Sequence, residues 1–553
     1  MTGGGDMEGF SSWCEVAPIG DLLVRGASLY PRRDAMVFPE TRRDYQSLLQ
    51  GAVTVARGLL ALGVRRGDHV GFLAINSPEL IEGMIGASLL GCVVVPLNAR
   101  HKSTELAYIV NNADLVALFT TCDGSEYVDY AEVLCNALPE LFKSPDPKRL
   151  RLNDAPKLQF TGLLRGPSRP GFLGRPEFDQ LALTIDPRHI EAARRCVRVR
   201  DIAMVLYTSG TTAKPKGCLL THEALTRGPV ERAAKRLSTG DRNVTWGAGP
   251  LFHIGSLGPF IGTIGVGGTY LTDTFFEPGR ALQLMIRERA TAAWPWFPAI
   301  VSALLDHPSF DPGLLQSLRV MLVICPPALM HRLQSVFPQA EILQACGMTE
   351  TAGIFAVSDR FETAKERATR QGLPEPGIEV RIVDVESGDE AAPGVVGELL
   401  VRGYCVFEGY FHDPEKTAAT LADDWLRTGD LYSRGSDGSL TFNGRLKDML
   451  KVGGENVAAI EVEAFLCEHP AVKLAEVVGM PDPRLDEVPV AFVELRSGTD
   501  LRAQELIEFC KGRIANYKIP RAIYFIEANQ WPMSATKVDK RALRSRLTHL
   551  NTK

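Results

Sequence analysis

A loop of hydroxyl, glycine and lysine residues follows an apolar strand in segment 205–223, and its residue types are suited to binding phosphate. The segment reads Val-Leu-Tyr-Thr-Ser-Gly-Thr-Thr-Ala-Lys-Pro-Lys-Gly-Cys-Leu-Leu-Thr-His-Glu. Backbone N–H groups, hydroxyls and ammonium charges in one loop can surround phosphate oxygens. The G-x-x-x-x-G-K-[ST] spacing of a Walker A loop is absent. The segment therefore predicts a phosphate-binding loop of another type.

The loop resembles the phosphate-binding signature of the adenylate-forming superfamily, which includes acyl-CoA synthetases, aryl-CoA ligases, luciferases and adenylation domains of peptide synthetases. The resemblance implies that a carboxylate oxygen attacks the α-phosphorus of ATP and that pyrophosphate leaves. Negative charge builds up in that transition state, so cations and oriented N–H donors supply most of the catalysis. Lys216 is then a catalytic residue, and further phosphate contacts come from Thr208, Ser209, Gly210, Thr211, Thr212 and Lys214. Ala213 replaces a glycine common in the family, which costs about 1 kcal/mol if the position needs a positive φ.

A second segment, 344–350, reads Gln-Ala-Cys-Gly-Met-Thr-Glu and resembles the Tyr-Gly-x-Thr-Glu segment of the same family. The resemblance implies that Thr349 contacts the α-phosphate, that Glu350 helps to hold Mg²⁺, and that Cys346 and Gly347 lie at the nucleotide. One carboxylate is enough, because Mg²⁺ shares its oxygen ligands between protein carboxylates and substrate phosphates. Cys346 stands where the family has a tyrosine against adenine, so that stacking face is missing. Without its context, a Thr-Glu pair would more often start a helix.

The segment Leu-Arg-Thr-Gly-Asp-Leu at 426–431 resembles the family's Thr-Gly-Asp segment, whose aspartate accepts hydrogen bonds from the ribose hydroxyls. A carboxylate suits this task because it is an acceptor that faces two O–H donors. By the same resemblance, Asp430 and Arg445 bind the nucleotide. Taken alone, Asp430 would be an ordinary turn aspartate after glycine.

His253 lies in the segment Pro-Leu-Phe-His-Ile-Gly-Ser at 250–256, which resembles the acyl- and aryl-CoA ligase form of the segment near the substrate carboxylate. The alternative is an ordinary core histidine. Amino-acid-activating domains carry an aspartate here, which this chain lacks. Small residues follow at Gly255, Gly258, Gly262 and Gly265. Together with the bulky segment 294–297, they favour a hydrophobic pocket for a medium-chain, aryl or ring-bearing carboxylic acid.

Segment 444–456 reads Gly-Arg-Leu-Lys-Asp-Met-Leu-Lys-Val-Gly-Gly-Glu-Asn and matches the family over its whole length. The resemblance implies that Lys447 is the hinge about which a C-terminal domain turns between two half-reactions. It also places Lys451, Gly453 and Gly454 on the face used for thioester formation with CoA. Paired glycines allow a narrow ligand to approach the backbone closely. A solvated linker is the alternative interpretation.

Segment 531–538, Trp-Pro-Met-Ser-Ala-Thr-Lys-Val, resembles the segment that carries the family's adenylation lysine. Lys537 would then bridge the attacking carboxylate and the α-phosphate. Two features depart from the family: Thr536 replaces a glycine, and the distance from proline to lysine is one residue short. Lys540 is the fallback candidate, and an ordinary surface lysine remains an alternative.

The elements that position these residues alternate between helix and strand. The patterns predict helices at 45–62 and 78–90, strands at 69–73, 92–96, 203–207 and 341–343, and a surface excursion over about 140–180. Such alternation predicts an α/β fold with mainly parallel sheets. Near residue 444 the pattern changes to a helix at about 456–467 and short strands at 476–478 and 490–494. We therefore predict a large N-terminal adenylation domain of several subdomains, residues 1–444, and a small mobile α+β domain, residues 445–553.

The composition is that of a globular protein of at least two domains. The chain has 553 residues, of which 45% are hydrophobic and 23% charged, and its formal net charge is −5. That charge argues against a dedicated nucleic-acid binder. The 11 cysteines form no C-x-x-C pair, which favours apolar packing in a reducing compartment. The start of the chain has no pattern of a signal peptide. The longest apolar run, 84–97, is too short to span a bilayer. A cytoplasmic location is therefore expected.

These features together predict an AMP-forming acyl-CoA ligase that uses ATP, Mg²⁺ and CoA, in fatty acid or aromatic acid metabolism. One alternative is an acyl-AMP ligase that loads a separate carrier protein. A luciferase-like oxygenase is a further possibility that no residue requires. A non-catalytic nucleotide- or acyl-binding member of the fold is the alternative from another class, and it is kept open by Ala213, Cys346 and Thr536.

Overall fold

The computed structural model describes most of the chain, with several gaps at predicted site residues. The described residues are 15–122, 128–144, 146–208, 214–237, 242–359, 361–452, 455–534 and 537–550. The predicted site residues Ser209, Gly210, Thr211, Thr212, Gly453 and Gly454 lie outside them, as do Ala213 and Thr536. For Lys537 the backbone is described and the side chain is not.

Two large sheets form the centre of the N-terminal part. The first has the order β6-β5-β3-β4-β7-β8 and the second β13-β12-β11-β9-β10-β1-β2. Their strands are β1 Asp34–Val37, β2 Arg42–Asp44, β3 His69–Leu73, β4 Val93–Pro96, β5 Leu115–Thr121, β6 Phe160–Arg165, β7 Ile202–Thr208, β8 Lys216–Thr221, β9 Val244–Gly247, β10 Thr269–Leu271, β11 Ala292–Trp296, β12 Val320–Val323 and β13 Glu341–Leu343. Within these two sheets the pairs β7–β8 and β1–β2 are antiparallel and the other pairs parallel. The predicted α/β fold with mainly parallel sheets is confirmed.

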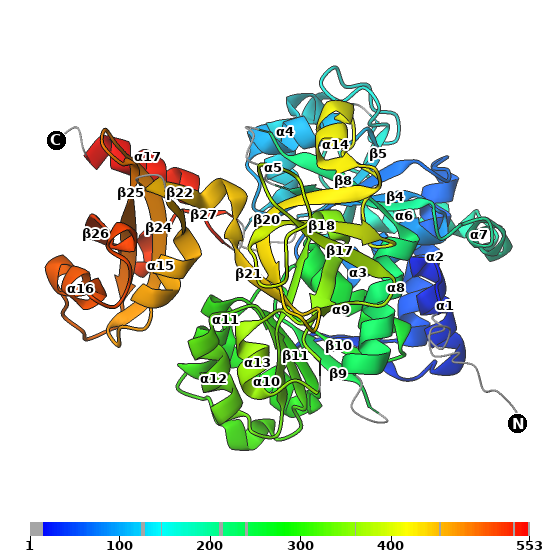
Figure 1. Cartoon of the computed structure of the whole chain (residues 1–553). Helices are drawn as coiled ribbons and strands as arrows, with labels where there is room; N and C mark the ends of the chain where they lie inside the picture. Colours follow the sequence, from blue (N-terminus) through cyan, green and yellow to red (C-terminus); the bar gives the residue numbers. More distant parts are fainter. Residues whose placement is uncertain are drawn as a thin grey trace, which may run out of the picture.

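Helices surround both sheets, and the apolar side chains of helices and strands form several separate core clusters (Figure 1). The helices are α1 Ile19–Leu29, α2 Tyr45–Ala61, α3 Pro78–Leu89, α4 Ser103–Asn112, α5 Tyr130–Ala137, α6 Arg175–Leu183, α7 Pro187–Arg194, α8 His222–Arg232, α9 Ile254–Gly265, α10 Pro278–Glu288, α11 Pro298–Leu305, α12 Pro327–Val336, α13 Ala364–Thr369 and α14 Pro414–Thr420. Side-chain caps start several of them: the Asp44 carboxylate accepts from the N–H of Ser47 at α2, and the Ser77 hydroxyl accepts from that of Leu80 at α3. Parallel strands that helices cover on both faces are buried on both faces, so their sequences are near-continuous apolar runs.

The surface excursion predicted over residues 140–180 is only partly correct. It contains β6, which pairs with β5, and α6, which packs against α2. The side chain of Phe178 lies so close to Gly58 that a Cβ on that glycine would be 2.3 Å from the ring. The prediction missed these elements because their apolar residues are few and their burial depends on partners far away in the chain.

Smaller antiparallel sheets follow the second large sheet. One has the order β14-β15-β16, with β14 Ala345–Met348, β15 Gly353–Val357 and β16 Leu373–Pro374. The other contains β17 Ile378–Val383, β18 Gly397–Gly403, β19 Leu421–Ala422, β20 Trp425–Arg434 and β21 Leu440–Arg445. The segment between β18 and β19 leaves this sheet and returns to the first large sheet.

The last hundred residues form a separate sheet with its own apolar core, drawn in orange and red to one side of the rest in Figure 1. Its elements are β22 Met449–Val452, β23 Glu455–Ala458, α15 Ala459–Leu466, β24 Val472–Asp482, β25 Asp486–Leu495, α16 Ala503–Cys510, β26 Ala522–Phe525, the hairpin strands β27 Met533–Ser534 and β28 Lys537–Val538, and α17 Lys540–Leu550. The helix predicted from residue 456 starts at Ala459, because residues 455–458 pair with β22. The predicted strands at 476–478 and 490–494 are longer than expected. The boundary at residue 444 stays a prediction.

Cysteine side chains pack in the interior, as expected. Of those that the structure describes, all are free thiols and all but Cys196 and Cys467 are buried. Among the described residues, no helix is both long and apolar enough to cross a membrane.

His222 is a buried base whose protonation is expected to destabilise the fold. It lies at the start of α8, and its Nδ1 accepts the N–H of Ile19 at 3.2 Å. Burial lowers the pKa of His222 to about 4, whereas an unfolded chain titrates near 6.5. The unfolded state therefore binds the proton more readily, and stability should fall by up to about 3 kcal/mol as the pH drops from about 6.5 to 4. Thermal unfolding between about pH 7 and 5 measures this dependence. In His222→Asn, which keeps a hydrogen-bond acceptor, the loss of stability at acidic pH should be smaller. If stability falls with pH equally in the wild type and the variant, the prediction is wrong.

Candidate active site

The predicted phosphate loop connects two antiparallel strands, β7 and β8. Thr208 ends β7 and pairs directly with Lys216, the first residue of β8. The ammonium nitrogen of Lys216 lies 5.4 Å from the ring centroid of Tyr410. Burial, and then the positive charge of Lys416, lower the pKa of Lys216. Lys214, also predicted to bind phosphate, has its ammonium 5.0 Å from the ring centroid of Tyr108.

Glu350 lies at the same place as Lys216, although it belongs to a different segment. It follows β14 in a short 3-10 helix, Thr349–Thr351, and only 9% of it is exposed. Its Oε1 accepts a hydrogen bond from the hydroxyl of Tyr410 at 2.8 Å. Gly347 of β14 allows close approach of the paired strand β15, because a Cβ on it would lie 2.2 Å from the carbonyl oxygen of Gly353. The structure thus brings the predicted Lys216 and Glu350 together on one tyrosine.

The side chains near Lys216 and Glu350 fit a magnesium ion that is bound partly by the protein and partly by the substrate. Among the described residues, no three or more His, Cys, Asp or Glu side chains gather as a metal site. Glu350 is a nearly buried carboxylate beside an ammonium group, and Thr349 next to it carries a hydroxyl. Mg²⁺ commonly takes one or two protein carboxylates and completes its shell with phosphate oxygens and water. The residues therefore fit Mg²⁺ bound with ATP and not an all-protein metal cage.

Asp430 and Arg445 face each other on neighbouring strands. They are paired residues of β20 and β21, and Arg445 Nε lies 3.6 Å from Asp430 Oδ1. The N–H of Asp430 donates to the Thr428 hydroxyl at 3.1 Å, and that hydroxyl donates to the carbonyl of Leu399 at 2.7 Å. Between them, Gly429 has a φ of +68°, which favours glycine. Thr428 therefore shapes the turn that presents Asp430, a contribution that the motif comparison did not assign to it.

Cys346 packs into the protein interior. It is buried beside Phe355, and its thiol is hydrogen-bonded with the hydroxyl of Tyr432. Burial raises the pKa of the Cys346 thiol well above its usual range. A contact of Cys346 with the nucleotide stays a prediction.

His253 caps a helix next to a group of aromatic side chains. It is the N-cap residue of α9, and its ring centroid lies 5.1 Å from that of Phe252. A Cβ on Gly255, the second residue of the helix, would lie 3.2 Å from the indole of Trp296. Trp296 and Trp294 meet edge to face at 5.2 Å and share an apolar cluster with Ile354 of β15. The His253 segment and β15, the strand that follows Glu350, therefore border the same aromatic group.

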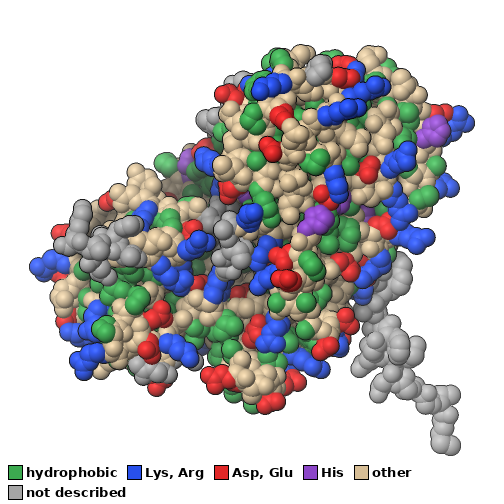
Figure 2. Space-filling view, turned by 90° about the horizontal axis from the view of Figure 1, so that it is seen from above, with side chains coloured by type: hydrophobic (Ala, Val, Ile, Leu, Met, Phe, Trp, Pro, Cys, Tyr) green, Lys and Arg blue, Asp and Glu red, His purple; other side chains and the backbone are tan. Residues whose placement is uncertain are grey.

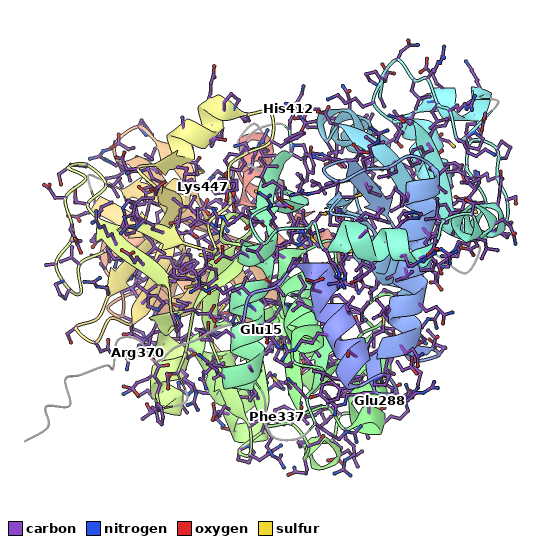
Figure 3. The ribbon with its side chains drawn as sticks, turned by 90° about the vertical axis from the view of Figure 1, so that its right-hand side faces the viewer. Glu15, Glu288, Phe337, Arg370, His412 and Lys447 are labelled. Atoms are coloured by element: carbon purple, nitrogen blue, oxygen red, sulfur yellow. The ribbon has the colours of Figure 1, made fainter. Side chains whose placement is uncertain are left out.

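The lysines near the C-terminal domain lie in different surroundings. Lys447, labelled in Figure 3, is an exposed residue just before β22; desolvation of its ammonium, and then Arg445, lower its pKa. Lys451 is on β22, and its N–H donates to Glu487 Oε2 at 3.1 Å. Figure 2 shows several Lys and Arg side chains where the smaller and larger parts of the molecule meet.

The two candidates for the adenylation lysine, Lys537 and Lys540, have different surroundings in the structure. Lys540 is largely buried and pairs with Glu463 of α15 and, at 3.5 Å, with Glu476 of β24. Lys537 begins β28, in the hairpin with β27. Because the Lys540 ammonium is held by two carboxylates of its own domain, it is the weaker candidate. The assignment of Lys537 stays a prediction.

Comparison with known proteins agrees with this geometry. A family model described as AMP-binding enzyme matches residues 23–411, and one described as AMP-binding enzyme C-terminal domain matches residues 461–537. The chain belongs to the AMP-binding enzyme family. It is 32% identical over 540 residues to a putative acyl-CoA synthetase, YngI, of Bacillus subtilis (strain 168), with 96% of each chain covered. It is 31% identical to a feruloyl-CoA synthase of Amycolatopsis sp, over 92% of this chain and 95% of that protein.

Mammalian relatives and solved structures agree with the bacterial ones. The mitochondrial medium-chain acyl-CoA ligase ACSF2 of Mus musculus is 30% identical, with 96% of this chain and 87% of that protein covered. The crystal structure of the anthranilate CoA ligase AuaEII with anthranoyl-AMP has a TM-score of 0.82 and 26% identity, over 97% of this chain and 98% of that one. The predicted enzyme class, an AMP-forming ligase of the acyl-CoA synthetase type, is confirmed.

Proposed function

We propose that this AMP-binding enzyme activates a hydrophobic carboxylic acid with ATP and transfers the acyl group to CoA. In the first half-reaction the carboxylate attacks the α-phosphorus, and pyrophosphate leaves. In the second, the CoA sulfur attacks the acyl-adenylate, and AMP leaves. The observation that carries the proposal is the convergence of Lys216 and Glu350 on Tyr410, because an ammonium and a buried carboxylate side by side suit a metal–triphosphate complex.

Many of the predicted residues have a task in the first half-reaction. Lys216 and the loop after β7 bind the β- and γ-phosphates, and Thr349 donates to the α-phosphate. Glu350 holds Mg²⁺, which when bound neutralises charge on the phosphate oxygens. Lys537 places an ammonium between the carboxylate and the α-phosphate, and Asp430 accepts from the ribose hydroxyls, with Arg445 beside it. His253 lies near the acyl carboxylate.

In the second half-reaction, the C-terminal domain turns about Lys447 and exchanges the face with Lys537 for the face with Lys451, Gly453 and Gly454. The antiparallel pairing of β22 and β23 supports this role of Lys451, because Lys451 pairs with Asn456, one pair before the last pair of the two strands. Domain rotation of this kind keeps the two steps in separate sites.

The substrate is a medium-chain, aryl or ring-bearing acid. The edge-to-face pair of Trp294 and Trp296 beside Gly255 supports a pocket with aromatic walls and limited depth. Relatives named for medium-chain, feruloyl and anthranilate substrates agree with this choice. We further propose a reducing, cytoplasmic location, which the free thiols support.

Pyrophosphate release from Mg·ATP across a panel of carboxylic acids, with and without CoA, tests the proposal. Release together with a CoA thioester and AMP is the expected result. Adenylate that accumulates regardless of CoA would indicate a carrier protein as the acceptor. No release with any acid, although ATP binds, would indicate a non-catalytic protein.

Trp296 is expected to limit the size of the acyl group. Replacing it by alanine removes an indole beside Gly255, so kcat/KM for bulkier acids should rise relative to compact ones by about tenfold or more. Competition between a compact and a bulky aryl acid measures this ratio. Trp425→Ala is the matched control, because Trp425 lies between Arg381 and Arg402 on another sheet. An unchanged ratio in Trp296→Ala would remove Trp296 from the pocket.

A further inference from the structure

Tyr410 belongs to a segment, 407–411, that runs beside β8 although it comes almost two hundred residues later in the chain. Three backbone hydrogen bonds join the two: Glu408 N to Leu219 O at 2.9 Å, Leu219 N to Gly409 O at 3.0 Å, and Phe411 N to Gly217 O at 2.8 Å. Cys218 and Tyr410 form an antiparallel bridge. The backbone of Tyr410 is therefore fixed to the strand that begins with Lys216.

Further contacts hold the segment on both sides of Tyr410. The N–H of Tyr410 donates to the Thr417 hydroxyl at 2.9 Å. Gly409 has a φ of +132°, and a Cβ on it would lie 2.7 Å from the Thr417 methyl group. Two residues after Tyr410 comes His412, which is labelled in Figure 3. Its Nε2 lies 2.9 Å from Asp114 Oδ2. A segment fixed so closely can hold one side chain in one orientation.

The side chain of Tyr410 contacts both predicted charged residues. Its hydroxyl donates to Glu350 Oε1 at 2.8 Å, and its ring centroid lies 5.4 Å from the Lys216 ammonium. The ring of Phe407 packs on it edge to face at 4.8 Å, and the Phe407 N–H donates to the Glu350 carbonyl at 2.9 Å. Glu350 is thus bound through both its main chain and its side chain by one short segment.

We propose that Tyr410 is a positioning residue, which orients the Glu350 carboxylate for the metal ion and sets its distance from Lys216. The inference rests on the proposed roles of those two residues. The Tyr410 hydroxyl is the donor in its 2.8 Å hydrogen bond to Glu350 Oε1, because an ionised carboxylate can only accept. Because Oε1 accepts the hydrogen bond from Tyr410, the Glu350 side chain keeps one rotamer. That rotamer fixes the direction of the other carboxylate oxygen, Oε2. Groups that hydrogen-bond a metal-binding carboxylate in this way typically affect metal affinity or activity by 10- to 100-fold.

Tyr410→Phe tests the proposal, because it keeps the ring near Lys216 and removes only the hydroxyl. Isothermal titration with Mn²⁺ in the presence of α,β-methylene-ATP measures metal affinity without turnover. We expect metal binding about tenfold weaker, with unchanged affinity for the nucleotide analogue in the absence of metal. The Mg²⁺ concentration for half-maximal pyrophosphate release should rise in parallel. A variant that binds Mn²⁺ like the wild type and keeps its Mg²⁺ requirement would overturn the inference.

Tyr45→Phe is the matched control. Tyr45 is fully buried, and its hydroxyl donates to the Gly268 carbonyl at 2.7 Å, away from the Glu350 segment. It should lose stability with no change in Mn²⁺ affinity. If both tyrosine variants weaken Mn²⁺ binding equally, the effect of Tyr410 is one of general packing, and the inference is wrong.

Glu350→Gln separates a failure of the inference from a failure of the proposed function. If Glu350→Gln weakens Mn²⁺ binding and Tyr410→Phe does not, the role of Tyr410 is wrong and that of Glu350 stands. If Glu350→Gln binds Mn²⁺ like the wild type, the proposed metal site itself is wrong. When both act as proposed, the double variant should lose little beyond Glu350→Gln, because coupled residues are not additive.

Discussion

Replacing Lys537 by alanine is expected to lower adenylate formation by at least about 10²-fold, whereas thioester formation from supplied acyl-AMP stays near the wild-type rate. The reason is that the ammonium group is needed only where negative charge builds up between the carboxylate and the α-phosphorus. Pyrophosphate release measures the first half-reaction, and CoA-thioester formation from synthetic acyl-AMP measures the second. Equal loss of both half-reactions would contradict the assignment of Lys537.

Lys540→Met is the comparison for that experiment. Lys540 is paired with Glu463 and Glu476 inside the C-terminal domain, and burial, together with Glu463, raises the pKa of Glu476 to about 7. Removing the ammonium leaves two carboxylates close together without their cation, so this variant should destabilise the domain and impair both half-reactions. A selective loss of adenylation in Lys540→Met, with Lys537→Ala active, would exchange the two assignments.

Replacing Arg232 by methionine is expected to destabilise the N-terminal part by about 3–5 kcal/mol. Arg232 Nε and Nη2 each donate to one oxygen of Glu375 at 2.7 Å, and Nη2 also donates to the Ile354 carbonyl at 3.2 Å. The two side chains are 4% and 9% exposed. Loss of the guanidinium leaves a buried carboxylate without its partner. The midpoint of thermal unfolding, which should fall by several degrees, measures the effect.

The double variant Arg232→Met with Glu375→Leu is the control for this pair. Removing both charges eliminates the uncompensated carboxylate, so much of the lost stability should return. If the double variant is as unstable as Arg232→Met, the loss comes from packing and not from the buried charge. The pair also ties the end of α8 to β15, the strand that follows Glu350, so a change in ATP affinity of Arg232→Met would show that this link matters for the site.

Much of the fold class and of the candidate site could be predicted from local patterns. The strands at residues 69–73 and 341–343 have the bounds that their apolar runs predicted. Lys216 and Glu350 were proposed from the sequence because they lie, with neighbouring glycines and hydroxyl residues, in short segments that resemble ligand-binding motifs. Such segments are readable because the residues that bind one ligand group lie a few positions apart.

Other features depended on contacts between distant segments. The element β6 was missed because its burial comes from β5 and α6 and not from its own pattern. The sequence favoured Lys537 and kept Lys540 as the fallback, but it did not show that Lys540 contacts Glu463 and Glu476. Thr428 was passed over because its hydrogen bond is to the backbone of another strand.

The sequence by itself thus determined the class of chemistry and the family and proposed the charged residues of the candidate site, because these belong to contiguous motifs. Only the tertiary structure decided which residues hold those charges in place. Tyr410 lies in none of the segments that the sequence analysis singled out; it reaches Glu350 because segment 407–411 pairs with β8. Backbone pairing across a long stretch of chain depends on the whole packed fold, and no local pattern encodes it.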